Sequence, residues 1–589
     1  MQDGQIPREP TPLHLPLSRY FLPQVCAYFL ANQLGWSLAV WLTLAVVLLL
    51  IALLLTLRSK SNKTPALGKD VDLGRIHNRA NRLLPIALGL LLFACYYEWR
   101  VGLQAEDAIT LPSEFPWPPS ETSLEVEVER LWANSGANRL AGLGRVTNAP
   151  PHARVAVGDR VAFDAFSNET WEQPPWVGSR VLLRGVRSAI VAADEETESL
   201  EPFGQWLRDQ GVGFQLQQGR VLEVLHHSQA RWPERANNRL EAQLRNGLPA
   251  DSPIVDVYVA MLLGKRVALS QDQLQAFRET GTMHFFAISG LHIKFIALTL
   301  FYILKFIGVP RLWGMVIGLI LLGLYVTVTG GAPSAVRAFL MVTFFWLGTS
   351  VSRRQYAPMA AWMNAAFLVL LIDPSTLFLV GFQLSYAVVA SIFLFGLPLL
   401  KVLQKRWDQF MQSFPTTDSK WIGLIVRGIN TAVTFLLTAF CVGLSAWMAS
   451  TPLTLLHFNL FVPGAVLMNV PLLILCAGTL IAGVLSLFFS LIGLAFIGAF
   501  LNHASLLYLW IMTSIVEAGH KSWLAGAPVE VVLPWPAAIG LIGFLLLSWH
   551  AEKQSGKQQV ERKLTSFLPA VFLLALGCTI AIVGAWILI

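Results

Sequence analysis

Residues 284–306 read HFFAISGLHIKFIALTLFYILKF, an apolar run long enough to cross a bilayer. Its first half also carries polar groups, namely His284, Ser289, Gly290, His292 and Lys294. An unpaired polar group in hydrocarbon costs several kcal/mol, so such groups usually face a bundle interior or a water-filled cavity. We therefore expect a translocation route or an intramembrane site here.

The rest of the chain is also apolar. Of its 589 residues, 54% are hydrophobic and only 13% are charged, which is outside the range of soluble globular proteins. The fold class we predict is a polytopic α-helical membrane protein. Further apolar spans are expected at 37–57, 83–97, 311–329, 334–350, 359–372, 377–400, 422–449, 452–475, 477–500, 503–517, 532–549 and 567–588.

The charge pattern predicts the orientation of the spans. Basic residues cluster between spans, and the positive-inside rule places such loops in the cytoplasm. The clusters are Arg58 to Arg82, Arg353-Arg354, Lys401 to Lys420 and Lys553 to Lys563. The net charge of +7 suits anionic lipid or an anionic cargo equally well.

Residues 101–235 form one sizeable polar region, which follows a span leaving the cytoplasm and is therefore expected outside. Several pieces alternate with period two or are short and apolar, which indicates a small β-barrel or sandwich. These pieces are Leu124 to Val128, Val161 to Ala165, Phe214 to Leu216 and Val221 to Leu225. The region's arginines suit phosphate contact, although a surface of mixed charge is more often simply solvated.

Two kinds of site are excluded or weakened by composition. All five cysteines, at 26, 95, 441, 476 and 578, fall in apolar segments without zinc-ligand spacing, so we expect small buried hydrophobes. No Walker A pattern occurs, so energy for transport must come from elsewhere.

Between residues 233 and 278 the pattern is helical, with an apolar face expected at Ile254, Val255, Tyr258, Val259 and Leu262.

The opening stretch allows more than one interpretation. On a continuous helix, His284, Ser289 and His292 would fall within an arc of about 140° and form one wall. Ser289-Gly290 could instead kink or break the helix. A serine three residues before a histidine also suggests a nucleophile and its base, but no carboxylate lies nearby in sequence to orient the histidine.

Three further polar clusters interrupt the spans. Gly330 to Ala338 is a glycine and proline turn that places Ser334 and Arg337 one helical turn apart, and the arginine could face an anionic cargo or snorkel to the interface. Asp373-Pro374 precedes Gly381 to Tyr386, where Gln383 and Tyr386 share a face suited to interhelical hydrogen bonds. Prolines and asparagines interrupt the apolar runs from Ser450-Thr451-Pro452 through His457-Phe458-Asn459 to Asn469-Val470-Pro471, which predicts broken helices.

Taken in order, these clusters resemble the ComEC family of competence proteins, the inner-membrane channels for DNA uptake in natural transformation. The matching motifs are Gly281 to His284, Ala287 to His292, Gly331 to Pro333 with Arg337-Ala338, Asp373-Pro374 with Gly381 to Ser385, and Asn469 to Pro471. Phe203 with Trp206 to Arg208 and Gln210-Gly211 resembles the end of the family's external OB-like domain. The resemblance covers about residues 20–588.

This sequence departs from the family in two places. Lys265-Arg266 follows Gly264 where an acidic residue is expected. Many members also continue into a metallo-β-lactamase-like domain, whereas no His-x-His-x-Asp-His motif occurs in this sequence. We therefore expect no nuclease activity, no catalytic residues, no metal and no cofactor.

The resemblance implies four regions. Residues 1–100 would hold N-terminal spans with a basic cytoplasmic loop, 101–235 an external OB-like domain, 236–555 the polytopic channel domain, and 556–589 a C-terminal span. OB-type barrels bind single strands through aromatic stacking and basic grooves. The aromatic candidates are Trp132, Phe163, Trp171 and Trp176, although core packing is the commoner role for each.

The implied function is import of single-stranded DNA across the inner (plasma) membrane. The residues expected to line the DNA path are His284, Ser289, Gly290, His292, Gly331, Ser334, Arg337, Gln383, Ser385 and Asn469. Implied partners are single-stranded DNA, membrane lipid, a DNA receptor, a cytosolic motor ATPase, a separate nuclease and further copies of the chain. The alternatives are a small-molecule or ion transporter and a membrane-embedded hydrolase using Ser289 and His292.

Overall fold

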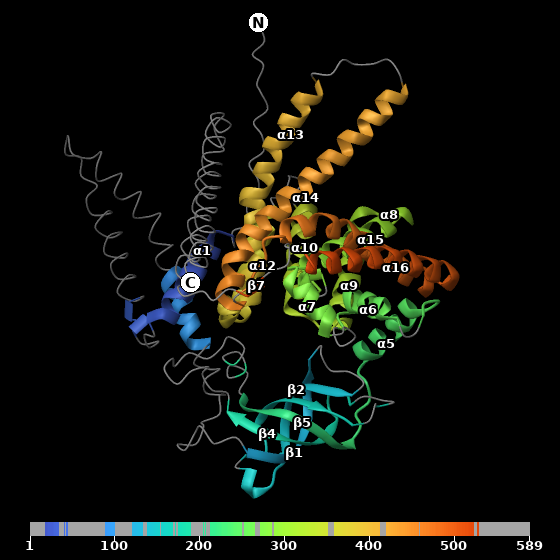
Figure 1. Ribbon diagram of the computed structural model, residues 1–589. Coiled ribbons are helices and arrows are strands. Elements are labelled where there is room, and N and C mark those ends of the chain that lie inside the picture. Colours follow the sequence, from blue (N-terminus) through green and yellow to red (C-terminus); the bar gives the residue numbers. More distant parts are fainter. Residues whose placement is uncertain are drawn as a thin grey trace, which may run out of the picture. The chain divides into compact units, whose positions relative to one another are not determined.

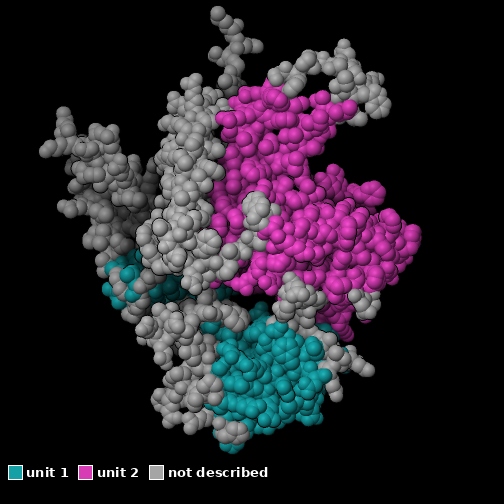
Figure 2. Space-filling model, in the orientation of Figure 1, with its two compact units in different colours: residues 1–230, 340–379 teal, residues 231–339, 380–589 magenta. Residues whose placement is uncertain are grey.

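The structure is a computed structural model. It describes residues 18–34, 40–44, 89–100, 120–189 and 212–528, with short gaps at 42, 133–137, 154, 169–170, 172–174, 250–251, 266–270, 286–287, 352–357, 413–419, 459 and 523–526, and it also describes residues 204 and 207. The chain divides into two compact units, coloured separately in Figure 2. One comprises residues 1–230 and 340–379, and the other comprises 231–339 and 380–589.

The first unit contains a closed five-stranded barrel, seen in Figure 1. Around the barrel the strands follow the order β1-β2-β3-β5-β4, and all pairs are antiparallel except β3 with β5. The strands are β1 Ser120–Leu131, β2 Arg139–Asn148, β3 Arg160–Phe166, β4 Arg180–Ala189 and β5 Val212–His226. A five-stranded barrel of this order is OB-like, so the predicted fold class is confirmed for this region.

The barrel core explains which strands could be predicted from the sequence. Alternate residues of β1 and β3, such as Leu124, Val126 and Phe163, point inward and are buried together. Those strands were predicted, whereas β2 and β4 were not. The two pieces predicted at 214–216 and 221–225 belong to one strand, β5. They looked separate in the sequence because an irregularity at Gln218, where φ is +50°, shifts the register between them.

The aromatic candidates for stacking prove to be mostly structural. Phe163 lies in the barrel core, Trp171 packs against that core, and Trp132 packs against a small cluster around Leu143. Trp176 is half-buried. Core packing is therefore the observed role of Phe163, and the other three are at most partly exposed.

The first unit also contains α1 Ser18–Leu34, helical residues 89–100, α11 Pro358–Ile372 and the short turn η4 Pro374–Phe378. Helix α1 packs against α11, and the amide of Gln24 and the hydroxyl of Tyr28 donate to the carbonyl oxygens of Phe367 and Leu370. Asp373 caps η4 by accepting from the backbone N–H of Ser375 at 3.1 Å.

The second unit is helical. Its elements are α5 Trp232–Arg245, α6 Pro253–Leu263, α7 Gln271–Glu279, η3 Met283–Phe285, α8 Gly290–Phe306, α9 Arg311–Val328, the start of α10 Pro333–Val351, α12 Val380–Ser391, the π-turn η5 Ile392–Gly396, α13 Leu397–Gln412, α14 Lys420–Phe458, β6 Leu460–Phe461, α15 Ala465–Leu491, α16 Ala495–His520 and β7 Ala527–Pro528. Helices α15 and α16 form an extensive pair, and α13 packs along α14 (Figure 1).

Six helical segments are long and apolar enough to cross a membrane, counted among the residues that the structure describes. They are 283–306, 311–328, 380–412, 425–458, 465–491 and 495–520. The chain is thus a multi-pass α-helical membrane protein with one small barrel, as predicted. Most of the span expected at 37–57, the spans expected at 532–549 and 567–588, and the basic clusters at 58–82, 353–354 and 553–563 lie outside the described residues.

Two predictions about helix ends were wrong, and the alternative left open at Ser289-Gly290 is decided in favour of a break. The segment from His284 is not one continuous helix, because α8 begins at Gly290 with Ser289 as its N-cap residue. The predicted breaks at Pro452 and Pro471 do not occur, since both prolines lie inside continuous helices, α14 and α15. At Pro452 the hydroxyls of Ser450 and Thr451 donate to the carbonyl of Trp447, which supports the helix locally.

Helix α6 also differs from its predicted one-sided pattern. It is buried on nearly all sides, including Val257 and Met261 as well as the predicted face. A helix that is apolar all round belongs in the interior of a bundle. One cysteine differs too: Cys26 is exposed, whereas Cys95, Cys441 and Cys476 are buried as expected.

Candidate functional site

Three helix starts converge in the second unit and bring three of the four polar clusters together. The hydroxyl of Ser334, in the first turn of α10, donates to the carbonyl of Ile288 just before α8, at 2.6 Å. A methyl group placed on Gly290 would lie 3.7 Å from Cβ of Ala338. One guanidinium nitrogen of Arg337 donates to the carbonyl of Gly381, at the start of α12, at 2.9 Å.

Local sequence explains why α10 begins where it does. Gly330 and Gly331 have φ values of +87° and +61°, a backbone region that suits glycine and closes α9. Pro333 then opens α10, where its missing N–H costs no helical hydrogen bond. This turn sets Ser334 and Arg337 on successive turns of one helix, as predicted.

Ser289 and His292 form a close pair at the start of α8. The Ser289 hydroxyl lies 2.9 Å from Nδ1 of His292, and the Ser289 backbone N–H points to the same nitrogen at 3.4 Å. A backbone N–H can only donate, so Nδ1 accepts and the neutral ring carries its proton on Nε2. The arrangement is a helix cap in which residue N3 reaches back to the N-cap residue.

Arg337 is the main charge in this cluster. It is only 7% exposed, and its Nε is buried without a hydrogen-bond partner in the part of the chain that the structure describes. No carboxylate contacts it among those residues; its hydrogen bond is to the Gly381 carbonyl. The side chain therefore points into the protein, and no described residue supplies a counter-ion to its charge.

The remaining predicted residues occupy different positions around this cluster. Gln383 and Ser385 are half-buried on α12, one turn beyond Gly381, and Tyr386 is buried against Phe382. His292 is fully buried, whereas His284 is exposed in η3, with Nδ1 3.1 Å from the Gly281 carbonyl oxygen.

Asn469 is not placed directly at the Arg337 cluster. It lies on α15, which packs against α8, and its Oδ1 is buried without a partner among the described residues. The start of α15 lies close to Gly281. A methyl group placed on Gly281 would lie 3.2 Å from Cβ of Ala465, the first residue of α15. The fourth cluster is therefore a neighbour of the residues that precede α8.

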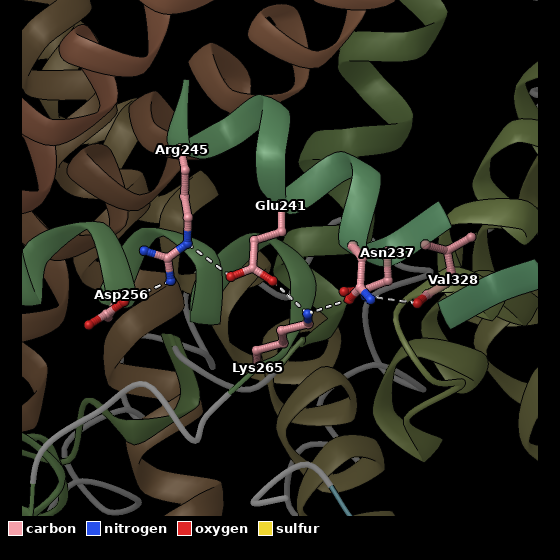
Figure 3. Close-up of polar contacts among 7 residues, drawn as sticks. Asn237, Glu241, Arg245, Asp256, Lys265 and Val328 are labelled. Carbon is pink, nitrogen blue, oxygen red and sulfur yellow. Dashed lines mark hydrogen bonds and ion pairs between the residues drawn. The ribbon is translucent and has the colours of Figure 1, made fainter. Parts of the chain in front are cut away.

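A second polar network, missed in the sequence, joins α5 to α6 and to Lys265 (Figure 3). Glu241 accepts from Lys265 Nζ at 2.6 Å and from Arg245 Nε at 2.9 Å, and Arg245 also donates to Asp256 at 2.8 Å. Burial raises the pKa of Glu241, but the hydrogen bonds and charges of Lys265 and Arg245 outweigh it, so its pKa lies below the ordinary value. Lys265, the departure from the family pattern, is thus an ion-pair partner.

A cavity of about 310 Å³ lies between α7 and α16, separate from the Arg337 cluster. Its wall includes Phe277, Glu517 and His520, and His520 Nδ1 lies 3.0 Å from Glu279. Among the described residues, no group of three or more His, Cys, Asp or Glu side chains is arranged to hold a metal ion.

Comparison with known proteins gives the following similarities. Residues 261–554 match the family described as "Competence protein". The chain is 30% identical to ComE operon protein 3 of Bacillus subtilis (strain 168) over 318 residues, 53% of this chain and 36% of that protein. It is 29% identical to Competence protein ComA of Neisseria gonorrhoeae over 201 residues, 32% of this chain and 28% of that protein.

A third relative is Uncharacterized protein YcaI of Escherichia coli (strain K12), 29% identical over 143 residues, 23% of this chain and 19% of that protein. The matches thus span about a third or less of the length of these relatives. No solved structure matches the chain.

Proposed function

We propose, from the premise that this chain belongs to the ComEC family of competence proteins, that its membrane domain conducts single-stranded DNA inward across the inner membrane. The family resemblance predicted from the motifs is confirmed. The barrel would receive the strand on the outer side, and a DNA receptor, a cytosolic motor, a separate nuclease and further copies of the chain are the partners that this role implies.

The observation that carries the proposal is the buried charge of Arg337, which no carboxylate of the described residues compensates. A buried cation without a carboxylate partner is costly, and polar residues of this kind inside membranes usually serve a cargo or ion path. A phosphodiester strand supplies negative charge to such a group. One cation with few neighbouring donors holds each phosphate weakly, so the strand can continue to move.

The other predicted lining residues support a path at the same place. Ser334, Ser289 and His292 surround the starts of α8 and α10, and Gly290, Gly331 and Gly381 keep side chains out of these starts. Gln383, Ser385, His284 and Asn469 complete the proposed lining at larger separations.

The test is uptake of labelled DNA into a nuclease-protected state, with protein level in the membrane measured for every variant. Arg337→Gln should reduce uptake by about tenfold or more, equivalent to ~1.4 kcal/mol in the barrier. Arg337→Lys should retain part of it. Arg311→Gln, at the exposed start of α9, is the matched control and should behave as wild type. Normal uptake by Arg337→Gln would remove the proposal's main support.

One observation favours a second candidate, a membrane-embedded hydrolase, because the Ser289 hydroxyl and His292 Nδ1 are 2.9 Å apart. That candidate predicts a hydrolytic product that disappears in both Ser289→Ala and His292→Ala, with uptake in Arg337→Gln unaffected. The channel predicts instead that Arg337→Gln reduces DNA uptake more than Ser289→Ala or His292→Ala does. A transporter of small molecules or ions would instead retain DNA uptake in all three variants and lose flux of its own cargo.

A further inference from the structure

One row of side chains crosses four strands of the barrel. Arg139 on β2 lies directly opposite Phe166 on β3, Phe166 opposite Arg220 on β5, and Arg220 opposite Arg184 on β4. Directly opposed residues share one face of a sheet. That face is the outer one, because the residues next to the row on β2, β3 and β4, namely Leu140, Ala165 and Leu183, are buried in the barrel.

Phe166 is an aromatic ring on this outer face. Its side chain is 49% exposed, whereas Phe163, three residues earlier on β3, lies in the core. The guanidinium carbon of Arg139 lies 5.2 Å from the centre of the Phe166 ring, within cation–π distance. Two hydrogen bonds to Asp164, at 2.9 and 2.6 Å, fix the Arg139 guanidinium in that position.

The other half of the row carries excess positive charge. Arg184 and Arg220 stand directly opposite each other, an arrangement that is unfavourable for like charges. Arg184 is paired with Glu121 at 2.8 Å, but Arg220 has no ion-pair partner within the described part of the chain. Arg145 and Arg160 are likewise opposed on β2 and β3, but both contact one carboxylate, Glu129, at 2.8 and 2.9 Å.

We propose that this row binds unpaired nucleic acid, with one base stacked on Phe166 and an adjacent phosphate contacting Arg220 and Arg184. The site deepens the proposed function and rests on it. Single-strand-binding barrels combine a basic track for the backbone with aromatic rings that accept any base face. In a duplex those faces are already stacked, so the row selects single strands over double strands.

The experiment measures binding to the purified full chain in detergent. Three probes separate the sources of affinity: oligothymidylate of about 20 nucleotides, longer than the site of one such barrel, an abasic sugar-phosphate strand of the same length, and a duplex. Phe166→Leu should weaken oligothymidylate binding roughly fivefold or more, the lower end of what one stacked base contributes, and should leave the abasic strand unchanged. Phe166→Tyr should restore binding.

The charged half of the row has its own signature. Arg220→Gln should weaken oligothymidylate and the abasic strand alike, and should reduce the slope of log affinity against log salt by about 0.7, as expected for one lost phosphate contact to a single strand. Val157→Ala and Arg145→Gln, both at exposed barrel positions outside the row, are the controls and should bind like wild type.

Equal oligothymidylate binding by wild type and Phe166→Leu, with unchanged thermal unfolding, would overturn the stacking site. This result is separable from failure of the proposed function, because the uptake defect of Arg337→Gln does not depend on the barrel. If instead Arg337→Gln takes up DNA normally while Phe166→Leu still loses oligothymidylate affinity, the barrel binds single strands and the membrane path is wrong.

Discussion

Polar side chains in the membrane region differ in how their hydrogen bonds are met. Asn502 on α16 is fully buried and has four partners: its amide nitrogen donates to the carbonyls of Gln243 and Asn246, and its Oδ1 accepts from Tyr258 and Ser486. Arg337 has a single hydrogen bond and an unpartnered Nε. The first pattern is structural, and the second is the pattern expected of a residue that meets a ligand.

Asn502→Leu should destabilise the chain strongly. The substitution removes four buried hydrogen bonds, and although Ser486 and the Gln243 carbonyl keep a second partner, each buried group left without one costs about 1–3 kcal/mol. Thermal unfolding in detergent should therefore occur at a clearly lower temperature. Ser514→Ala, on the exposed side of the same helix, removes only a local bond to Trp510 and should have little effect. Similar unfolding of both variants would contradict this role.

Polar residues that are costly in an apolar span could be singled out from the sequence. Residues whose role depends on hydrogen bonds to distant parts of the chain could not. Arg337, Ser289 and His292 were singled out because charge and polarity are costly in an apolar span. Asn502 gave no such signal, because three of its four partners lie 244 to 259 residues earlier in the chain. Phe166 was missed for a different reason: it lies three positions after the inward Phe163 and so on the other face of β3, and the exact register was not known.

The ends of elements were the least predictable part of the fold. Proline and asparagine indicated breaks at 450–452 and 469–471, yet α14 and α15 continue through them, because hydroxyls and neighbouring helices support the backbone inside a membrane protein. The break occurs instead at Ser289-Gly290, which the sequence allowed but did not require. Long apolar spans were predicted because continuous hydrophobicity is a strong signal, but between residues 422 and 517 four were expected where the structure has three helices, α14, α15 and α16.

Glu241 attaches helix α5 to Lys265, and Arg245 attaches it to Asp256 of α6. Because the pKa of Glu241 is lowered, its contribution is sensitive to acid. A carboxyl whose folded-state pKa is below its unfolded value, about 4.3, stabilises the fold fully above that value and loses this contribution as pH falls through the folded pKa. Wild-type unfolding temperature should therefore drop below about pH 4.3 more steeply than that of Glu241→Gln.

The control for this pH profile is Glu223→Gln, at an exposed position on β5, which should follow wild type throughout. The measurement is thermal unfolding in detergent across neutral to acidic pH. Parallel curves for wild type and Glu241→Gln would show that the ion pairs with Lys265 and Arg245 contribute nothing to stability, and the structural role given to Lys265 would then be wrong.

For the whole molecule, the basic residues on α13 predict which side of the membrane its end faces. Lys401, Lys405 and Arg406 are exposed there, and the positive-inside rule places them in the cytoplasm. The barrel is expected on the opposite side. In a chain with Cys26 and Cys578 replaced by serine, Val157→Cys should react with a membrane-impermeant maleimide in intact cells, whereas Phe410→Cys should react only after permeabilisation. Reaction of Phe410→Cys in intact cells would reverse the orientation.

The central claim is that a single DNA strand passes the starts of α8, α10 and α12 beside Arg337. The most direct measurement is photo-crosslinking during uptake, with a photoreactive amino acid at Ser334, which lies inside this cluster, or at Val336, which is exposed on the same turn of α10. The account predicts crosslinks to single-stranded DNA at position 334 and none at position 336. Active uptake with no crosslink at 334, or with equal crosslinks at both positions, would contradict it.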